Sequence, residues 1–300
     1  VEAPLGKKDC KYRDSNLQVT AVQETKERLT GRAGLSLFVA YIYAIELFPL
    51  IDRFFGSMRK SKKGASVPSM FKQILCFMFD GTSRHITHFD KLKNDPGYAG
   101  VIETDMKDMV SSHQIKRFFK AFAWVRIFLF RRLLHKLFIW RLKVKHPEII
   151  ELGIDTMVMD NDDAECRHGV KPTYKKKKGF QPLQMNWGRL IVDAVFRGGD
   201  KHSNHGDTVE KMISHMASKI RKAYRQDVPI VMRMDSGFFD QKIFNLCEEL
   251  NIGYVCGGKM YEDIKDVARA HENPDWTRFD SEKRDEEWEY IEFGTKRGNW

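Results

Sequence analysis

The spacing of apolar residues divides the chain into two parts that differ in period. Up to about residue 147, apolar positions recur every three or four residues, which is the period of a helix with one buried face. Three stretches show this period, with Ser or Pro between them: residues 34–55, 69–81 and 111–146. The pattern predicts a helical N-terminal region over residues 1–147.

From Pro147 onward, short apolar runs alternate with amphipathic segments. The runs are rich in Val, Ile and Met and have the length of strands. The expected strands are 148–160, 185–199 (one strand or a hairpin), 229–235 and 253–259, and the expected helices are 207–225 and 240–251. This order predicts an α/β domain whose sheet has parallel members and helices packed on its faces. The charged, aromatic tail over residues 275–300 favours further strands outside that pattern.

Composition indicates the charge of the partner. Of 300 residues, 42% are apolar, and 51 Lys and Arg outnumber 41 Asp and Glu to give a net charge of +10. This excess favours a polyanionic partner, with nucleic acid preferred over membrane. Five cysteines without paired spacing, and the lack of a secretory signal or a long uncharged apolar run, predict a cytoplasmic protein. A start without Met and an end at Trp300 lead us to expect a fragment.

Two basic segments are candidates for contact with a polyanion. The stretch from Ser111 to His146 carries ten Lys or Arg and no acid; such a helix can lie along DNA or an anionic membrane, or be a core helix whose basic side chains reach water. The segment from Arg167 to Arg189 is also free of acids and is interleaved with aromatic residues that can stack on bases. Its alternative is a solvated hairpin. The expected DNA contacts are Lys116, Arg117, Lys120, Lys171, Lys175, Lys176, Lys177, Lys178 and Arg189.

Two aspartates are the candidates for chemistry. Asp155 lies inside the apolar run "GIDTMVMD", and Asp235 ends the run "PIVMRMD". Neighbouring strands would bring the carboxylates within about 4–8 Å, close enough to share divalent cations. Crowded carboxylates raise each other's pKa unless a cation neutralises them, and hard oxygen ligands suit Mg²⁺ or Mn²⁺. The alternative is that each aspartate only caps a turn.

Other motifs carry weaker signals. "GYVCGGKM" has phosphate-loop spacing, but Met260 stands where Ser or Thr must bind Mg²⁺. The acidic run 160–165 lacks the glycine and the later glutamate of a calcium loop. Cys166, His168, His202 and His205 do not form a standard zinc motif. "HSNHGD" is typical of a turn and cap before a helix.

An ordered series of segments resembles the DDE transposases of bacterial insertion sequences, and most closely the thirteen-eighty branch of the insertion-sequence four superfamily. The series runs from "LTGRAGLSLF" and "ITHFDKLKNDP" through "GIDTMVMD", "GVKPTYKKKKGFQPL" and "GGDKHSNHGDTVEKMI" to "MRMDSGFFD" and "GYVCGGKM". The resemblance implies a ribonuclease H-like catalytic domain over 148–270, preceded by a DNA-binding and assembly region over 1–147. Residues 271–300 would begin a β-rich insertion.

The resemblance also implies the chemistry. Asp155 and Asp235 match the first two members of a catalytic acidic triad that holds two Mg²⁺ or Mn²⁺ ions. The third member, a glutamate after the insertion, is expected beyond Trp300, with Glu262 as the only substitute. Water would cleave the transposon end, and the freed 3′-hydroxyl would attack target DNA, in a nucleoid-associated protein that can act as a homodimer. A nuclease of the same fold and an inactive DNA-binding derivative remain the alternatives.

Overall fold

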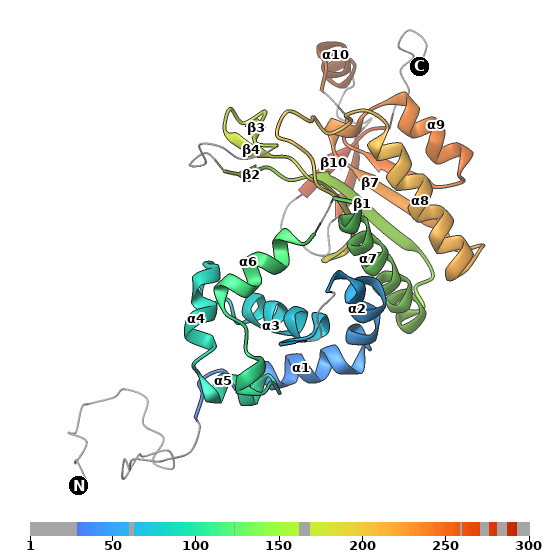
Figure 1. Ribbon diagram of the computed structural model, residues 1–300. Helices are drawn as coiled ribbons and strands as arrows, with labels where there is room; N and C mark the ends of the chain where they lie inside the picture. Colours follow the sequence, from blue (N-terminus) through green and yellow to red (C-terminus); the bar gives the residue numbers. More distant parts are fainter. Residues whose placement is uncertain are drawn as a thin grey trace, which may run out of the picture. The chain divides into compact units, whose positions relative to one another are not determined.

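The structure is a computed structural model that describes residues 29–59, 63–122, 124–161, 169–258, 260–270, 276–280 and 287–292. The chain divides into two compact units, Val1–Leu129 and Phe130–Trp300. Figure 1 shows helices in the first unit and a sheet with helices in the second. Each unit is described by itself.

The described elements of the first unit are all helical. Its α-helices are α1 (Leu35–Ala44), α2 (Leu47–Phe55), α3 (Val67–Asp80), α4 (Phe89–Leu92), α5 (Pro96–Val101) and α6 (Ser112–Lys120). Its short 3₁₀ helices are η2 (Gly56–Met58), η3 (Ile86–His88) and η4 (Met106–Asp108). The period of three to four residues therefore predicted the type of element correctly in this part of the chain.

The first apolar stretch is two helices rather than one. Glu46, between α1 and α2, has a φ of 53°, a left-handed conformation that ends a helix. In the described part of the chain no single helix is long and apolar enough to cross a membrane. The segments Leu35–Ala44 and Leu47–Met58 reach the length and apolar content of a membrane span only when they are counted together, and they are bent by 68° relative to each other.

The long basic helix expected over residues 111–146 is also two helices, α6 and α7 (Trp124–Lys145). α6 begins with a capping box, in which Ser111 Oγ accepts a hydrogen bond from the Gln114 amide and Gln114 Oε1 accepts one from the Ser111 amide. After α6, the Phe122 ring packs with the rings of Phe71 and Phe118. This aromatic packing holds the end of α6 in the first unit, so the basic residues do not lie along one continuous helix.

The second unit contains a five-stranded sheet in the order β6-β5-β1-β7-β8. The strands are β1 (Ile150–Thr156), β5 (Leu183–Trp187), β6 (Leu190–Val195), β7 (Ile230–Met234) and β8 (Gly253–Cys256). β5 and β6 form an antiparallel hairpin next to β1, whereas β1, β7 and β8 are parallel. The segment 185–199 is therefore a hairpin, and the expected order of strands and helices is confirmed.

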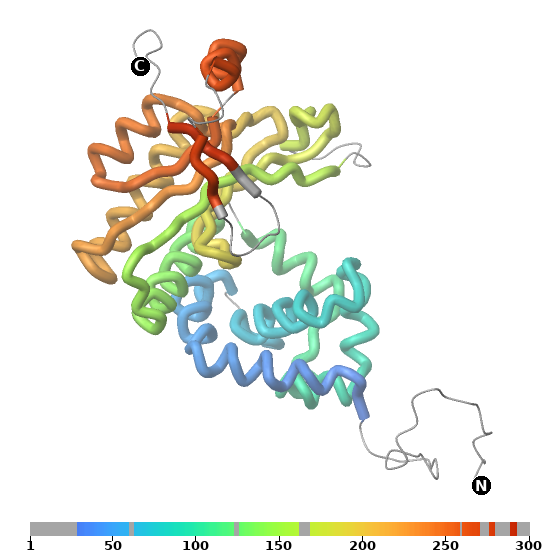
Figure 2. The backbone as a smooth tube through the Cα atoms, turned by 180° about the vertical axis from the view of Figure 1, so that it is seen from behind, coloured from blue at the N-terminus to red at the C-terminus, as the bar shows by residue number. Residues whose placement is uncertain are grey.

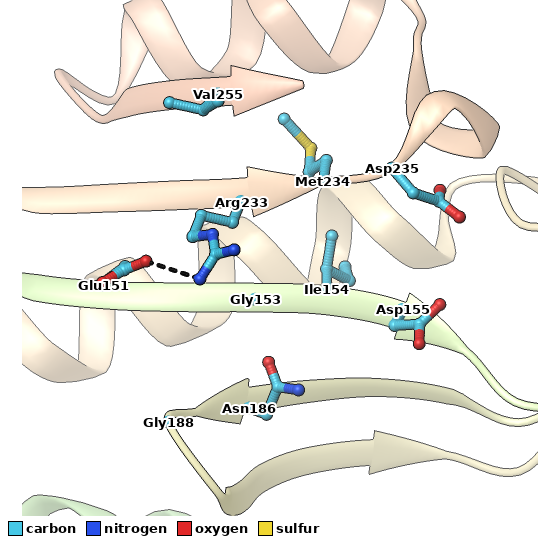
Figure 3. A pocket seen from close by; sticks show the side chains of 10 residues that line it. All are labelled: Glu151, Gly153, Ile154, Asp155, Asn186, Gly188, Arg233, Met234, Asp235 and Val255. Atoms are coloured by element: carbon cyan, nitrogen blue, oxygen red, sulfur yellow. Dashed lines mark hydrogen bonds and ion pairs between the residues drawn. The ribbon is translucent and has the colours of Figure 1, made fainter. Parts of the chain in front are cut away.

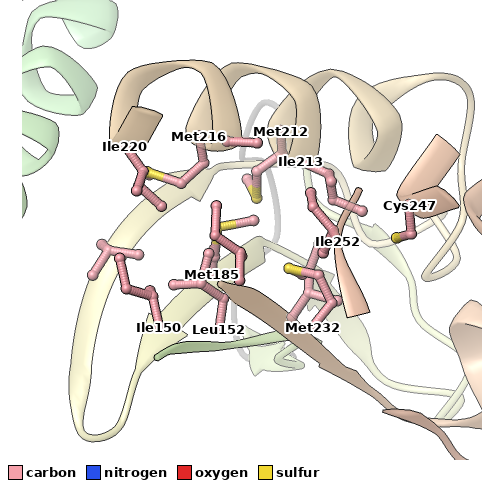
Figure 4. Packing of buried hydrophobic residues seen from close by; sticks show 14 of the residues in the cluster. Ile150, Leu152, Met185, Met212, Ile213, Met216, Ile220, Met232, Cys247 and Ile252 are labelled. Atoms are coloured by element: carbon pink, nitrogen blue, oxygen red, sulfur yellow. The ribbon is translucent and has the colours of Figure 1, made fainter. Parts of the chain in front are cut away.

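Helices α7, α8 (Thr208–Ala223) and α9 (Gln241–Glu249) pack their apolar side chains against those of the sheet to form the core of this unit. Figure 4 shows Met212, Met216 and Ile220 of α8 lying over Leu152 of β1 and Met232 of β7. These helix positions are three to four residues apart, so they form one buried stripe. The odd-numbered residues of β1 and β7 point to the opposite face of the sheet, because side chains alternate along a strand.

Two smaller sheets complete the described elements. β2 (Met159–Asp160), β4 (Lys178–Phe180) and β3 (Lys171–Pro172) form an antiparallel sheet. β9 (Thr277–Asp280) and β10 (Glu287–Tyr290) form a separate antiparallel pair, after helix α10 (Glu262–Ala270). The tail therefore contains two strands outside the main sheet, which Figure 2 shows in red, and the charged, aromatic sequence of the tail favoured such strands.

The unit boundary falls within α7, at Leu129, whereas the sequence placed the domain boundary at residue 147. Phe138 and Leu142 of α7 are buried in the core of the second unit. Arg131 donates from Nε and Nη2 to both carboxylate oxygens of Asp193 on β6, at 2.7 and 2.6 Å. Most of α7 thus packs with the sheet, which the change from helical to strand period at Pro147 could not reveal.

Candidate active site

Asp155 and Asp235 lie at matching positions on neighbouring parallel strands. In the register of β1 and β7, Ile154 pairs with Met234, and each aspartate is the next residue along its chain. Adjacent strands are about 5 Å apart. Both residues are exposed, and both belong to the set that points away from the helix-covered face. The structure therefore brings the two predicted carboxylates together at one edge of the sheet.

The backbone orients one oxygen of each carboxylate. Asp155 Oδ1 accepts a hydrogen bond from the Thr156 amide at 2.6 Å, and Asp235 Oδ1 accepts one from the Gly237 amide at 2.9 Å. Asp235 is thereby the N-cap of the short helix η5 (Ser236–Phe238). Within the described residues, neither Oδ2 atom accepts a hydrogen bond or pairs with a cation. Each aspartate thus stabilises a local turn and still offers one carboxylate oxygen to a ligand.

A pocket of about 480 Å³ opens on this face of the sheet, with both aspartates in its lining. Figure 3 shows Asp155 and Asp235 side by side at one end, while Glu151 and Arg233 pair further along β1 and β7. Arg233 Nη1 donates to Glu151 Oε1 at 3.0 Å, and both side chains are exposed. At Gly153 an added Cβ would collide with the side-chain oxygen of Asn186, so any larger residue there would displace the Asn186 amide.

The loop between β6 and α8 reaches the same edge. Ser203 Oγ lies 3.3 Å from Thr156 Oγ1, so the loop touches the residue that follows Asp155. Partial desolvation and the positive charges of Lys201, His202 and Arg197 lower the pKa of His205, which keeps the ring neutral at pH 7. The loop forms the expected turn before α8. Asp207 stands at the N-cap position of α8, but its side chain makes no capping hydrogen bond.

Cys256 lies beside Asp235 from the neighbouring strand β8. Its Sγ lies 3.3 Å from the Asp235 carbonyl oxygen, to which the thiol donates. Burial and the negative charge of Asp235 raise the pKa of Cys256, so the thiol stays protonated near neutral pH. Sulfur is a soft donor, so the ligands at this edge that suit a hard cation are the carboxylate oxygens.

The described residues contain no group of three or more His, Cys, Asp or Glu side chains that could hold a metal ion. Glu262, the substitute considered for the third carboxylate, is in α10 and joins no such group. Neither the structure nor the family match supports the expectation that the third carboxylate lies beyond Trp300.

The zinc candidates do not form a site among the described residues. His202 and His205 belong to no group of three or more possible metal ligands there. Cys166 and His168 lie outside the described residues, as does most of the acidic run 160–165.

The predicted DNA contacts of the second unit lie on two different turns. Lys171 and Lys175–Lys178 belong to the β3–β4 hairpin, where the Lys175 ammonium lies 5.7 Å from the centroid of the exposed Tyr174 ring. Lys177 Nζ donates to Asp160 Oδ2 at 2.8 Å. Arg189 is instead in the turn between β5 and β6. The described part of this acid-free segment, residues 169–189, therefore carries its basic side chains on two separate turns rather than on one hairpin.

The predicted contacts of the first unit lie on α6. Lys116, Arg117 and Lys120 are exposed, while Ile115 and Phe118 of the same helix are buried. α6 thus presents a basic face to solvent, as a DNA-contacting helix requires. Arg131, counted among the basic residues of the expected long helix, is instead paired with Asp193.

Sequence reasoning missed two residues, Asp193 and Ser203. Asp193 has the same signal as Asp155, an acid inside an apolar strand, but its side chain is fully buried between Arg131 and His135. Burial favours its neutral form, but the two hydrogen bonds from Arg131 and the approach of His135 Nε2 to 3.1 Å outweigh that effect and lower the pKa of Asp193 to about 2. Ser203 has no sequence signal beyond its place in a polar loop.

The fold and the paired aspartates define an α/β protein with an acidic pocket at the ends of two parallel strands, preceded by helices. The family follows from the sequence match. Residues 12–300 match the family described as Transposase DDE domain group 1, and the chain therefore belongs to this family of DDE transposases. No curated protein matches the chain.

Solved structures of transposases show low similarity to the chain. The catalytic domain of Mos1 mariner transposase is 11% identical, with a TM-score of 0.28 over 51% of this chain and 74% of that chain. A piggyBac transposase synaptic complex with hairpin DNA is 14% identical, with a TM-score of 0.34 over 90% and 50%. A Mos1 mariner paired-end complex with Mn is 8% identical, with a TM-score of 0.27 over 80% and 90%. Similarity this low does not establish a shared arrangement, so the family assignment depends on the sequence match.

Proposed function

We propose that this chain carries the catalytic centre of a DNA transposase, with Asp155 and Asp235 as two of its metal ligands. The observation that carries the proposal is the parallel register of β1 and β7, which places the two carboxylates next to each other on an open face. Membership of the DDE transposase family supports phosphoryl transfer on DNA as the reaction class. The second unit would then be a ribonuclease H-like catalytic domain.

The donor set fits a hard divalent cation. Each aspartate has one oxygen held by a backbone amide and a second that no described residue engages. Carboxylate oxygens are the ligands that Mg²⁺ and Mn²⁺ prefer, whereas the sulfur of the neighbouring Cys256 is a softer donor. When two such ions are bound, they supply an activated water or hydroxyl nucleophile and neutralise the charge on the leaving oxygen.

The chain's own residues would hold the ions and the DNA in position. The Thr156 and Gly237 amides fix the orientation of the two carboxylates before any ligand binds, so little reorganisation is needed. The lysines of the β3–β4 hairpin and the basic face of α6 would contact phosphates of the DNA backbone. The pocket over Gly153 gives access to the carboxylates from the face that the described helices of this unit leave open.

A strand-joining assay tests the proposed function. Incubated with Mg²⁺ and DNA carrying the ends of its own element, the protein should cleave at the ends and join the freed 3′-hydroxyl to a second DNA. Cleavage without joining would identify a nuclease of the same fold. DNA binding that needs no metal and leads to no cleavage would identify an inactive DNA-binding derivative, and would contradict the proposal.

Replacing Lys175 and Lys176 together by Ala should weaken DNA binding across all sequences. Each lost phosphate contact should reduce the slope of log K against log salt by up to about one unit. The measurement is DNA affinity by fluorescence anisotropy over a series of salt concentrations.

The matched control is the pair Lys211→Ala and Lys265→Ala. These lysines form ion pairs with Asp207 and Glu262 on exposed helix surfaces, so the control removes the same formal charge elsewhere in the unit. The control should retain most of the salt slope. Equal slopes for the two double variants would assign the β3–β4 hairpin to an ordinary solvated surface.

Several finer assignments also belong to this proposal. The order of motifs supports placement in the thirteen-eighty branch of the insertion-sequence four superfamily, with an assembly region before the catalytic domain and a β-rich insertion after it. Substrate chemistry supports double-stranded DNA as the partner, at transposon ends and target, and a homodimer in the DNA complex would hold two ends together. A transposase must reach chromosomal DNA, and this requirement supports a nucleoid-associated location in the cytoplasm.

A further inference from the structure

Ser203 lies at the meeting point of the two turns that follow the aspartates. Its hydroxyl is 3.3 Å from Thr156 Oγ1, on the Asp155 side. On the Asp235 side it packs against Gly237, where an added Cβ would lie 2.7 Å from Ser203 Oγ and 3.0 Å from Asp235 Oδ1. Gly237 is the residue whose amide orients Asp235, so Ser203 contacts the residue directly after Asp155 and the residue two positions after Asp235.

The loop that carries Ser203 is held from two sides. Arg197 is buried and donates from Nη1 to the Ser203 carbonyl at 3.2 Å and from Nε to the Gln181 carbonyl at 3.1 Å. The Asn204 amide nitrogen donates to Asp240 Oδ2, and Asp240 is the N-cap of α9. The loop at Ser203 is therefore fixed through Arg197 to the segment just before β5, and through the Asn204 side chain to the start of α9, which limits how far Ser203 can move from the aspartates.

We propose that Ser203 is a positioning residue that sets the separation and orientation of the Asp155 and Asp235 carboxylates for a divalent cation. Its hydroxyl links to Thr156, and its bulk against Gly237 limits how closely the turn after β7 can approach. Without this hydroxyl, Thr156 loses a partner and the turn after Asp155 gains freedom. The cation must then order both carboxylates on binding, which lowers its affinity. This inference depends on the proposed metal site at the two aspartates.

The test measures Mn²⁺ binding to the full chain without DNA, by the loss of the free-ion signal in electron paramagnetic resonance. Ser203→Ala should bind Mn²⁺ about three- to tenfold more weakly, the change expected when one hydrogen bond is lost. Thr156→Val removes the partner hydroxyl while keeping the shape of the side chain, and it should give a similar loss. The double variant should be no weaker than the weaker single variant, because both changes remove the same contact.

Two controls separate positioning from general damage. Ser218→Ala, at an exposed position of α8, should retain the wild-type Mn²⁺ affinity. DNA affinity in EDTA should be unchanged in Ser203→Ala and Thr156→Val, because neither hydroxyl is part of the basic hairpin. If Ser203→Ala does not fold, the isosteric Thr156→Val variant carries the test.

The outcomes distinguish this inference from the proposed function. Wild-type Mn²⁺ affinity in both Ser203→Ala and Thr156→Val, with weakened binding in Asp155→Asn, would overturn the role of Ser203 and leave the metal site standing. Mn²⁺ binding that survives unchanged in Asp155→Asn and Asp235→Asn would contradict the metal site itself, and the inference with it. A loss in both hydroxyl variants that is not additive supports Ser203 as a positioning residue.

Discussion

Replacing Asp155 or Asp235 by Cys should reduce Mg²⁺-dependent DNA cleavage by at least about a thousandfold. Mg²⁺ requires hard oxygen ligands, and a thiol offers a softer atom at a different distance from the strand. DNA binding measured in EDTA should remain within about twofold of wild type, because neither carboxylate contacts a described basic residue. The measurement is the initial rate of end cleavage with affinity measured in parallel.

Breaking the buried pair between Arg131 and Asp193 should destabilise the second unit by about 3–5 kcal/mol. Asp193 is fully buried, so Arg131→Met leaves its charge without its strongest partner. The measurement is the free energy of unfolding by urea. The exposed pair Glu151 and Arg233 is the matched control, and Arg233→Met should cost no more than about 1 kcal/mol. A similar small effect for both variants would contradict the anchoring role of Asp193.

The same pair should make stability depend on pH. The pKa of Asp193 is lowered to about 2, below the ordinary value of 3.8, so the native state favours the ionised form. Its contribution is complete above about pH 4 and is lost as the pH falls towards 2. Urea unfolding at pH 5 and pH 3 should show a smaller loss of stability on acidification in Asp193→Asn than in wild type.

The strands that carry the aspartates could be predicted because each is a short apolar run. In "PIVMRMD" the run is bounded by a turn, so the sequence predicts both the strand and the position of the acid at its end. Asp193, in "LIVDAV", has the same local pattern and a different role. The difference is that Asp155 and Asp235 point to the open face, while Asp193 faces Arg131 of α7. Which face a strand buries depends on tertiary packing, which the local pattern does not contain.

Two features could not be predicted from the sequence: the division of two apolar stretches into α1 with α2 and α6 with α7, and the contact of Ser203 with Thr156. The reasons are related. The apolar spacing continues through Glu46 and through residues 121–123, so only the backbone conformation and the aromatic packing of Phe122 show where the helices end. Likewise, Ser203 and Thr156 are 47 residues apart, and their contact depends on the register of the sheet and the path of a loop. Long-range contacts of this kind leave no periodic signal in a single sequence.

The most direct test of the central claim is the metal specificity of the Asp155→Cys and Asp235→Cys variants. Cleavage of end DNA would be measured with Mg²⁺ and with Mn²⁺ or Cd²⁺, which accept sulfur ligands more readily, and Asp155→Asn and Asp235→Asn would serve as controls. If the two carboxylates hold the cations, the sulfur-accepting metals should restore cleavage in at least one Cys variant but in neither Asn variant. Cleavage by both Asn variants at the wild-type rate in Mg²⁺ would show that the catalytic metal site lies elsewhere.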